Sequence, residues 1–206
     1  MSLQAVIARI AQIDEIVSPR PPAAPATTTG ASGFLTALDG VQHSSALAAP
    51  AAAPQLGAGT AGQRAIAAAQ AEVGVAEQPP GSNDSPRIAE YRTATAGSGI
   101  GPWCAYFTSW CAAQAGAPLG EAGQGFGSVE AVYAWAQRTG RAVAAGPGVT
   151  PSPGDLIVWG GRHIGIVESV DPDGSIHTIE GNSSNAVTRR TYGPDGGGAT
   201  GYVRLG

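Results

Sequence analysis

At Pro153 the pattern of apolar residues changes from helical spacing to short β-rich runs. Upstream, apolar residues recur three and four apart and predict helices around residues 63–73, 85–93, 102–115 and 128–138, the last with Ser128 as N-cap. Downstream, turns separate the expected strands DLIVWG, HIGIVESV, SIHTIEGN, AVTRRTY and GYVRL. Because the connections are short, the strands should pair antiparallel. The pattern therefore predicts an α+β domain with its helices packed on one side of the sheet.

Two further zones precede this domain. One face of residues 1–17 carries apolar side chains three and four apart, namely Leu3, Val6, Ile10, Ile13 and Val17. This spacing predicts an amphipathic helix, which at this length needs a partner to bury its apolar side. Residues 18–62 are rich in Ala, Pro, Thr, Gly and Ser and are expected to form a flexible linker. Within them GFLTALDGV, residues 33–41, either docks on a partner or is linker as well. The folded domain is assigned to residues 63–206.

Composition excludes several classes of protein. The net charge is −4, every basic residue is arginine, and Arg189 and Arg190 form the only adjacent basic pair, which argues against a nucleic-acid surface. No apolar run reaches the roughly 18 residues that span a bilayer. The start of the chain has neither the basic region nor the continuous apolar region of a secretory signal. We therefore expect no membrane span and no signal peptide.

Both cysteines lie in GPWCAYFTSWC, residues 101–111. On a helix Cys104 and Cys111 would be about 10.5 Å apart along the axis, beyond the roughly 7 Å between Cα atoms that a disulfide tolerates. Two cysteines also do not complete a zinc site. Cys111 is interpreted as a core thiol. Cys104 stands at the helix start, where free N–H groups and the helix dipole favour a thiolate, so it is either a core thiol or a nucleophile.

A nucleophilic cysteine needs a base, and three histidines are available. His43 falls in the linker, and His177 lies within a strand, where a half-exposed structural role is expected. His163 opens the strand HIGIV and is the candidate base. In the next strand, Glu180 and Asn182 are two residues apart and should project to one face, so that either can accept the ring N–H of His163.

A cysteine at a helix start, followed by PGDLIVW, the strand HIGIVESV and then IEGN, resembles the CHAP family of cysteine peptidases and amidases. This family belongs to the NlpC/P60-like, papain-like superfamily, and the resemblance covers roughly residues 63–205. It implies a papain-like fold and hydrolysis of amide bonds in bacterial peptidoglycan. It further implies that Cys104 is the nucleophile and His163 the general base, with Glu180 and Asn182 as the remaining polar members of the site.

The resemblance also implies a substrate groove lined by Trp103, Tyr91 and Asn83, the last in the loop GSNDSPR. Trp103 is equally compatible with the core, and Asn83 with a helix-capping turn. Some relatives bind calcium in an acidic loop near the cysteine. Here DPDG is interpreted as a hairpin turn and ND is too sparse for firm calcium binding, so no metal or other cofactor is predicted.

Two other functions compete with this one. The first is a zinc hydrolase that uses Cys104, His163 and His177, although no H-E-x-x-H motif occurs. The second is a non-catalytic wall-binding or flagellar scaffold with the same fold.

A wall hydrolase acts outside the cytoplasm, so an export route other than a cleaved signal peptide is expected. The start MSLQAVIARIAQIDEIV is similar to the openings of flagellar-operon wall hydrolases, which suggests a flagellar partner and export through the flagellar apparatus. The other interpretations are self-association through residues 1–17 and docking of this helix on the catalytic domain.

Overall fold

The computed structural model describes residues 59–206. The amphipathic helix expected at residues 1–17, His43 and almost all of the linker expected at residues 18–62 lie outside the described residues. Within residues 59–206 the elements follow the predicted order of helices first and strands second.

Four helices precede the strands of the described part. They are α3 (Ala61–Ala71), α4 (Pro86–Arg92), α5 (Cys104–Gln114) and α6 (Val129–Arg138). Side chains cap three of them, because Thr60, Ser85 and Ser128 accept hydrogen bonds from backbone N–H groups of the first helical turns. Ser128 thus has the predicted capping role. Helix α3 begins two residues before the expected position, and a capping box formed by Thr60 and Gln63 fixes its start.

The strands form one antiparallel sheet in residues 59–206. They are β1 (Ala142–Ala144), β2 (Leu156–Trp159), β3 (His163–Val170), β4 (Ile176–Ser183), β5 (Ala186–Tyr192) and β6 (Gly201–Val203), in the spatial order β1-β6-β2-β3-β4-β5. The five predicted strands are present, and β3 and β5 have the predicted bounds. Strand β1 was not predicted. The sequence DPDG forms the turn between β3 and β4 with a Gly174 N–H bond to the Asp171 carbonyl, as expected.

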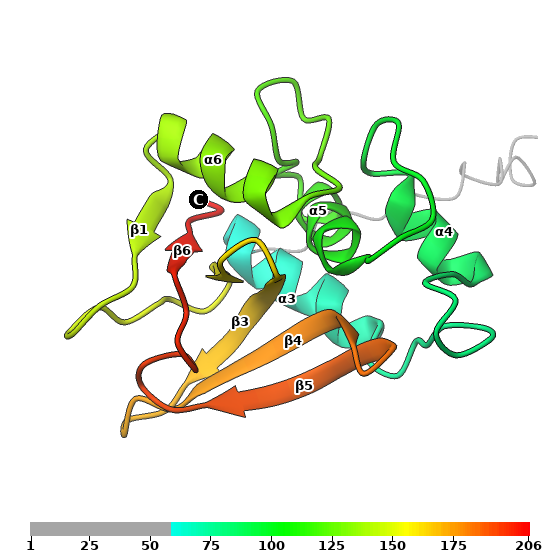
Figure 1. Cartoon of the computed structure of the whole chain (residues 1–206). Coiled ribbons are helices and arrows are strands. Elements are labelled where there is room, and N and C mark those ends of the chain that lie inside the picture. The colour runs from blue at the N-terminus through cyan, green and yellow to red at the C-terminus, as the bar shows by residue number, and fades with distance from the viewer. Residues whose placement is uncertain (1–58) are drawn as a thin grey trace, which may run out of the picture. The chain divides into compact units, whose positions relative to one another are not determined.

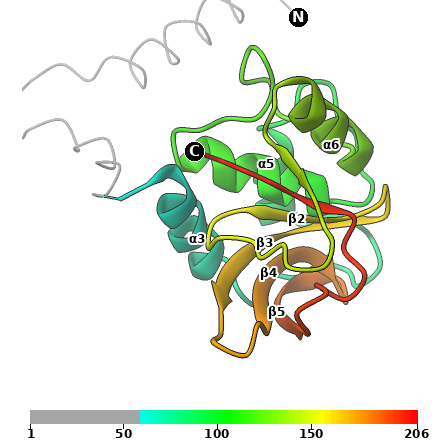
Figure 2. The same cartoon turned by 90° about the vertical axis from the view of Figure 1, so that its left-hand side faces the viewer.

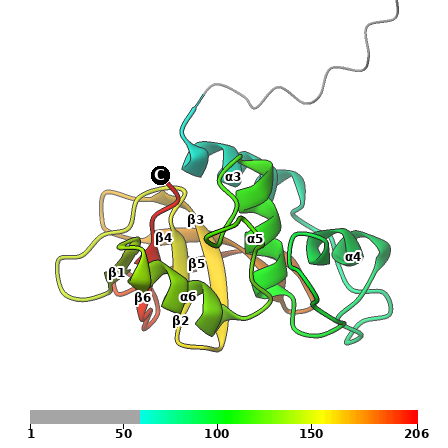
Figure 3. The ribbon, with the colours of Figure 1, turned by 90° about the horizontal axis from the view of Figure 1, so that it is seen from above.

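The helices cover one face of the sheet, as predicted, and α5 is the central one (Figures 1 and 2). Leu156, Val158, Ile164, Ile166 and Ile179 point from β2, β3 and β4 into the main core beneath α3, α5 and α6. On the other face, a smaller cluster is formed by Ile157, Trp159, Val167, Ile176 and Tyr202. Figure 3 shows α4 on the side of α5 that faces away from the strands. The fold is α+β and is consistent with a CHAP domain.

Close packing between α5 and β4 depends on Gly181. A Cβ atom at this position would come within 2.5 Å of the Phe107 Cβ atom, closer than two carbon atoms can pack. The missing side chain therefore lets β4 approach the first turns of α5. This contact determines how the residues of β4 lie relative to the start of the cysteine helix.

Candidate active site

Cys104 is the first residue of α5. Trp103 is the N-cap of the helix. Pro102 lies before the cap, so the helix begins two residues later than predicted. No side chain caps this helix start, and the first intrahelical bond runs from the Phe107 N–H to the Trp103 carbonyl at 2.9 Å. The backbone N–H groups of the first turn, which begins at Cys104, therefore have no acceptor within the helix. Together with the helix dipole, they stabilise negative charge on the sulfur or on a bound oxygen.

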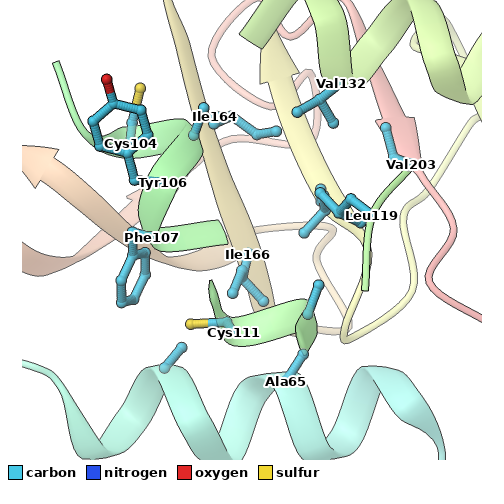
Figure 4. Close-up of a cluster of buried hydrophobic side chains, with 14 of the residues drawn as sticks. Ala65, Cys104, Tyr106, Phe107, Cys111, Leu119, Val132, Ile164, Ile166 and Val203 are labelled. Atoms are coloured by element: carbon cyan, nitrogen blue, oxygen red, sulfur yellow. The ribbon is translucent and has the colours of Figure 1, made fainter. Parts of the chain in front are cut away.

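Cys111 has a different environment, although it lies on the same helix. It is completely buried, and Figure 4 shows it in the apolar cluster with Ala65 of α3 and Ile166 of β3. Burial raises the pKa of the Cys111 thiol well above its ordinary value. Both cysteines are free thiols. Cys111 is therefore a core residue, as predicted, whereas Cys104 is the one at the helix start.

His163 opens β3 and lies between Glu180 and Cys104. Its Nε2 atom is 2.8 Å from the Glu180 Oε2 atom, and the Cys104 thiol is close enough to raise the pKa of the ring. Trp159, the directly paired residue on β2, stacks on the imidazole with the ring centroids 5.5 Å apart. The ring is therefore fixed in its plane by Trp159 and in its rotation by Glu180. This arrangement presents one imidazole nitrogen to the cysteine sulfur.

The electrostatics of this site favour a protonated imidazole. Burial of the ring lowers the pKa of His163, but interactions with Cys104 and Glu180 outweigh this effect and raise the pKa to about 9. Burial raises the pKa of the Glu180 carboxyl. Its hydrogen bonds and the nearby His163 outweigh burial and hold this pKa below its ordinary value. An imidazolium therefore lies between the carboxylate and the sulfur at neutral pH.

Glu180 is held by more partners than the sequence indicated. Its Oε1 atom accepts hydrogen bonds from the Thr178 hydroxyl at 2.6 Å and the Tyr192 hydroxyl at 2.8 Å, and the residue is only 1 % exposed. A Cβ atom at Gly165 would lie 2.7 Å from the Glu180 Cγ atom, so only glycine leaves room for the carboxylate over β3. Thr178 could have been found by strand alternation, because it is two residues before Glu180.

Asn182 lines the same depression as His163, but among the described residues it is Glu180, the other predicted candidate, that bonds to the imidazole. A bulge interrupts the pairing between Glu180 and Ser183, and Asn182 has a φ of 57°, so regular strand alternation fails here. In the orientation that satisfies both ends of its amide, Asn182 donates to the Glu77 Oε1 atom at 3.2 Å and accepts the Trp103 N–H at 3.1 Å. Asn182 therefore ties β4 to the residue that precedes Cys104, while Glu180 accepts the hydrogen bond of the imidazole.

Two of the three predicted groove residues lie in the core. Trp103 and Tyr91 are completely buried. The Trp103 indole donates to Glu77 at 2.9 Å, and the Tyr91 hydroxyl donates to Glu72 at 2.6 Å. Both side chains are packed in the core and have no surface that a substrate could contact. The prediction that Trp103 and Tyr91 line the substrate groove is therefore wrong. Asn83 is partly exposed with a φ of 56°, and its contact with substrate stays a prediction.

The second histidine of the described part, His177, is separate from this site. Its Nε2 atom is 2.8 Å from Asp171, and its Nδ1 atom is 3.0 Å from the Thr191 hydroxyl. Within residues 59–206, no group of three His, Cys, Asp or Glu side chains is placed to hold a metal ion. The structure thus does not bring His177 together with Cys104 and His163, as a zinc site of these residues requires.

The comparison with known families agrees with the geometry. Residues 95–182 match the family model described as the CHAP domain, a stretch that includes Cys104, His163, Glu180 and Asn182. Neither a curated protein nor a solved structure matches the chain. No helix among residues 59–206 has the length and apolarity that crossing a bilayer requires. A CHAP domain indicates amidase or peptidase activity of the peptidoglycan-hydrolase type, which is exerted on the cell wall. Residues 95–182, which include the start of α5 and the strands that hold His163 and Glu180, are therefore consistent with a CHAP domain.

Proposed function

We propose that this protein hydrolyses an amide bond of bacterial peptidoglycan by a thiol mechanism, with Cys104 as nucleophile, His163 as acid and base, and Glu180 as the group that orients His163. The observation that carries the proposal is that Cys104 begins the uncapped helix α5 and raises the pKa of His163, whose ring is bonded to Glu180 at 2.8 Å. A nucleophile, a base in contact with it and a third group that fixes the base are the parts this chemistry needs.

The reaction follows from this arrangement. The Cys104 thiolate attacks the amide carbonyl and forms a tetrahedral intermediate, and the His163 imidazolium then gives its proton to the leaving amine. The resulting thioester is attacked by water, with the now neutral imidazole as base. Collapse of the second intermediate releases the acid and regenerates the thiolate and imidazolium. Glu180 stays ionised throughout and stabilises the imidazolium.

The start of α5 supplies the site for the developing oxyanion. The backbone N–H of Cys104 belongs to the first turn, which no side chain caps. A carbonyl oxygen placed there gains a hydrogen bond and the favourable end of the helix dipole. Asn182 accepts the Trp103 N–H, one residue earlier, so that this N–H is not available to a substrate oxygen.

A thiol-specific reagent tests the class of mechanism. Wild-type protein incubated with purified peptidoglycan should release soluble fragments, and mass spectrometry should identify either the amide between N-acetylmuramic acid and L-alanine or a peptide bond of the stem or cross-bridge as the one cut. Pretreatment with iodoacetamide is expected to stop this release, because it alkylates the nucleophile. Treatment with a chelator should leave the release unchanged. Inactivation by the chelator and not by iodoacetamide would instead support a metal-dependent hydrolase, and no release by untreated protein would support a binding module.

Changing Glu180 and Asn182 separates orientation of the imidazole from support of the helix start. Glu180→Gln should lower kcat more than Asn182→Ala, because it removes the negative charge that stabilises the imidazolium. It should also move the alkaline limb of the pH–rate profile from about pH 9 to lower pH, since Glu180 raises the pKa of His163. Asn182→Ala should leave that limb in place. An equal shift in both variants would contradict the separate roles.

A further inference from the structure

A surface depression adjoins the imidazole on the sheet face opposite α5. It has a volume of about 650 Å³ and extends from Trp159 and His163 across β4 to Tyr192 on β5. Arg162, which directly precedes β3, and Arg190 on β5 both line it, and β4 lies between these two strands. The volume falls within the range of about 300 to 1,000 Å³ that is usual for sites binding small ligands. Because His163 lines the depression, a molecule bound there is adjacent to the reacting bond.

The depression has no free acidic group. Glu180 is its one acidic lining residue among residues 59–206, and this carboxylate already accepts hydrogen bonds from His163, Thr178 and Tyr192. The remaining polar lining groups are mostly hydroxyls, of Ser183, Ser184 and Thr191 among others. The side chains that remain available for a ligand are therefore cationic or hydrogen-bonding ones, in a chain whose net charge is −4.

Arg162 and Arg190 differ from most arginines of the described part, because neither pairs with a carboxylate there. The arginines in ion pairs are Arg87, Arg92, Arg138, Arg189 and Arg204. Arg190 is nevertheless held in place, since its Nε and Nη2 atoms donate to the Ser183 and Ser184 hydroxyls at 3.0 and 2.7 Å. Ser183 is the last residue of β4, and Ser184, with a φ of 56°, lies in the tight turn that follows. The guanidinium is thus oriented without being neutralised.

We infer that Arg162 and Arg190 bind a free carboxylate of the peptide stem beside the bond that is cut. The inference rests on the proposed function, because it is peptidoglycan that supplies stem peptides with free carboxylates near their amide bonds. A guanidinium matches a carboxylate in planarity and hydrogen-bond geometry, and two of them lining one depression fix its position. The site therefore selects acidic stems over stems in which that carboxylate is amidated.

Muropeptides released from sacculi by a muramidase provide the probe. One portion is left unmodified, and in the other the free carboxylates are converted to amides with carbodiimide and ammonia. Wild-type protein should cleave the unmodified portion with a kcat/KM at least about tenfold higher, as expected for loss of hydrogen bonds to a charged group. Arg162→Ala together with Arg190→Ala should lower kcat/KM on unmodified muropeptides by a similar factor, mainly through KM, and should abolish the preference.

Two further variants keep this test interpretable. Arg138→Ala removes an arginine of α6 that pairs with Glu121 on the surface, and it should retain wild-type kinetics and preference. Arg162→Ala alone removes a side chain that makes no hydrogen bond within residues 59–206, so it should leave the melting temperature unchanged and still weaken the preference. Equal cleavage of both portions by wild type, or a preference that survives in the double variant, would overturn the inference while the proposed function stands. Failure of wild type to cleave either portion would overturn the proposed function itself.

Discussion

Cys104→Ala is expected to lower the rate of peptidoglycan hydrolysis at least about a thousandfold while the protein stays folded. The sulfur is the only group at the start of α5 that can form the thioester, and alanine leaves the imidazole with nothing to activate. Cys104→Ser should be nearly as inactive, because a hydroxyl is far less acidic than a thiol and gains little from the same imidazolium. Release of soluble fragments from purified sacculi measures the rate, and far-ultraviolet circular dichroism checks the fold.

The second cysteine provides the matched control for this prediction. Cys111 is on the same helix but completely buried, and its thiol has a pKa raised well above the ordinary value. Cys111→Ala should therefore keep most of the activity and cost on the order of 1 kcal/mol of unfolding free energy, from the small cavity that it leaves. An inactive Cys111→Ala with an unchanged circular dichroism spectrum would show that the nucleophile has been assigned to the wrong cysteine.

The strands that sequence reasoning found are rich in β-branched or aromatic residues and bounded by turn residues. HIGIVESV and AVTRRTY contain several β-branched residues each, and pattern and structure agree over the bounds of β3 and β5. Strand β1 has three residues, Ala142–Ala144, and its small side chains carry almost no pattern. It forms because β6 offers it a free edge, with Val143 paired to Tyr202. Such pairing is a property of the folded sheet and cannot be read from the segment itself.

For the residues of the site, too, those with a local sequence signal were predicted, and those placed by strand pairing were missed. Position in a local element was enough to select Cys104 and His163, since one begins a helix and the other begins a strand. Tyr192 and Trp159 were not predicted, because their places beside Glu180 and His163 depend on how separate strands pair. In the described part, Asn182 bonds elsewhere because a bulge breaks the alternation from which its direction was inferred. Its link to Trp103 is a tertiary contact with no local pattern.

The groove expectation for Trp103 and Tyr91 failed for a related reason. Eight of the eleven residues of α5 are buried, so the helix has no polar stripe to show which side faces solvent. In such a helix an aromatic residue next to the nucleophile can pack inward or outward with the same sequence pattern. Here the buried carboxylates of Glu77 and Glu72 accept the indole N–H and the phenol O–H, which stabilises the inward position.

His163→Ala is expected to be about as inactive as Cys104→Ala, because the imidazole both maintains the thiolate and protonates the leaving amine. His177→Ala is the matched control and should keep most of the activity, since His177 bonds to Asp171 and Thr191 and takes no part in the site. Release of soluble fragments from the same purified sacculi measures the activity of both variants. Loss of activity in His177→Ala, with His163→Ala still active, would reverse the assignment of the base.

The two inactive variants should also be non-additive. Cys104 and His163 are expected to act as one nucleophile–base unit, so removal of either destroys the function of both, and the double variant should be no slower than each single one.

His163→Ala should in addition alter how stability depends on pH. The pKa of His163 is raised from about 6.5 to about 9 in the folded protein, so its protonation stabilises the fold fully below about pH 6.5, and this contribution is lost as the pH rises through 9. Chemical denaturation of wild type across pH 6 to 10 should show that decline, and His163→Ala should lack it. A decline of equal size in both proteins would mean that the imidazole is not the group held in its protonated form between Glu180 and Cys104.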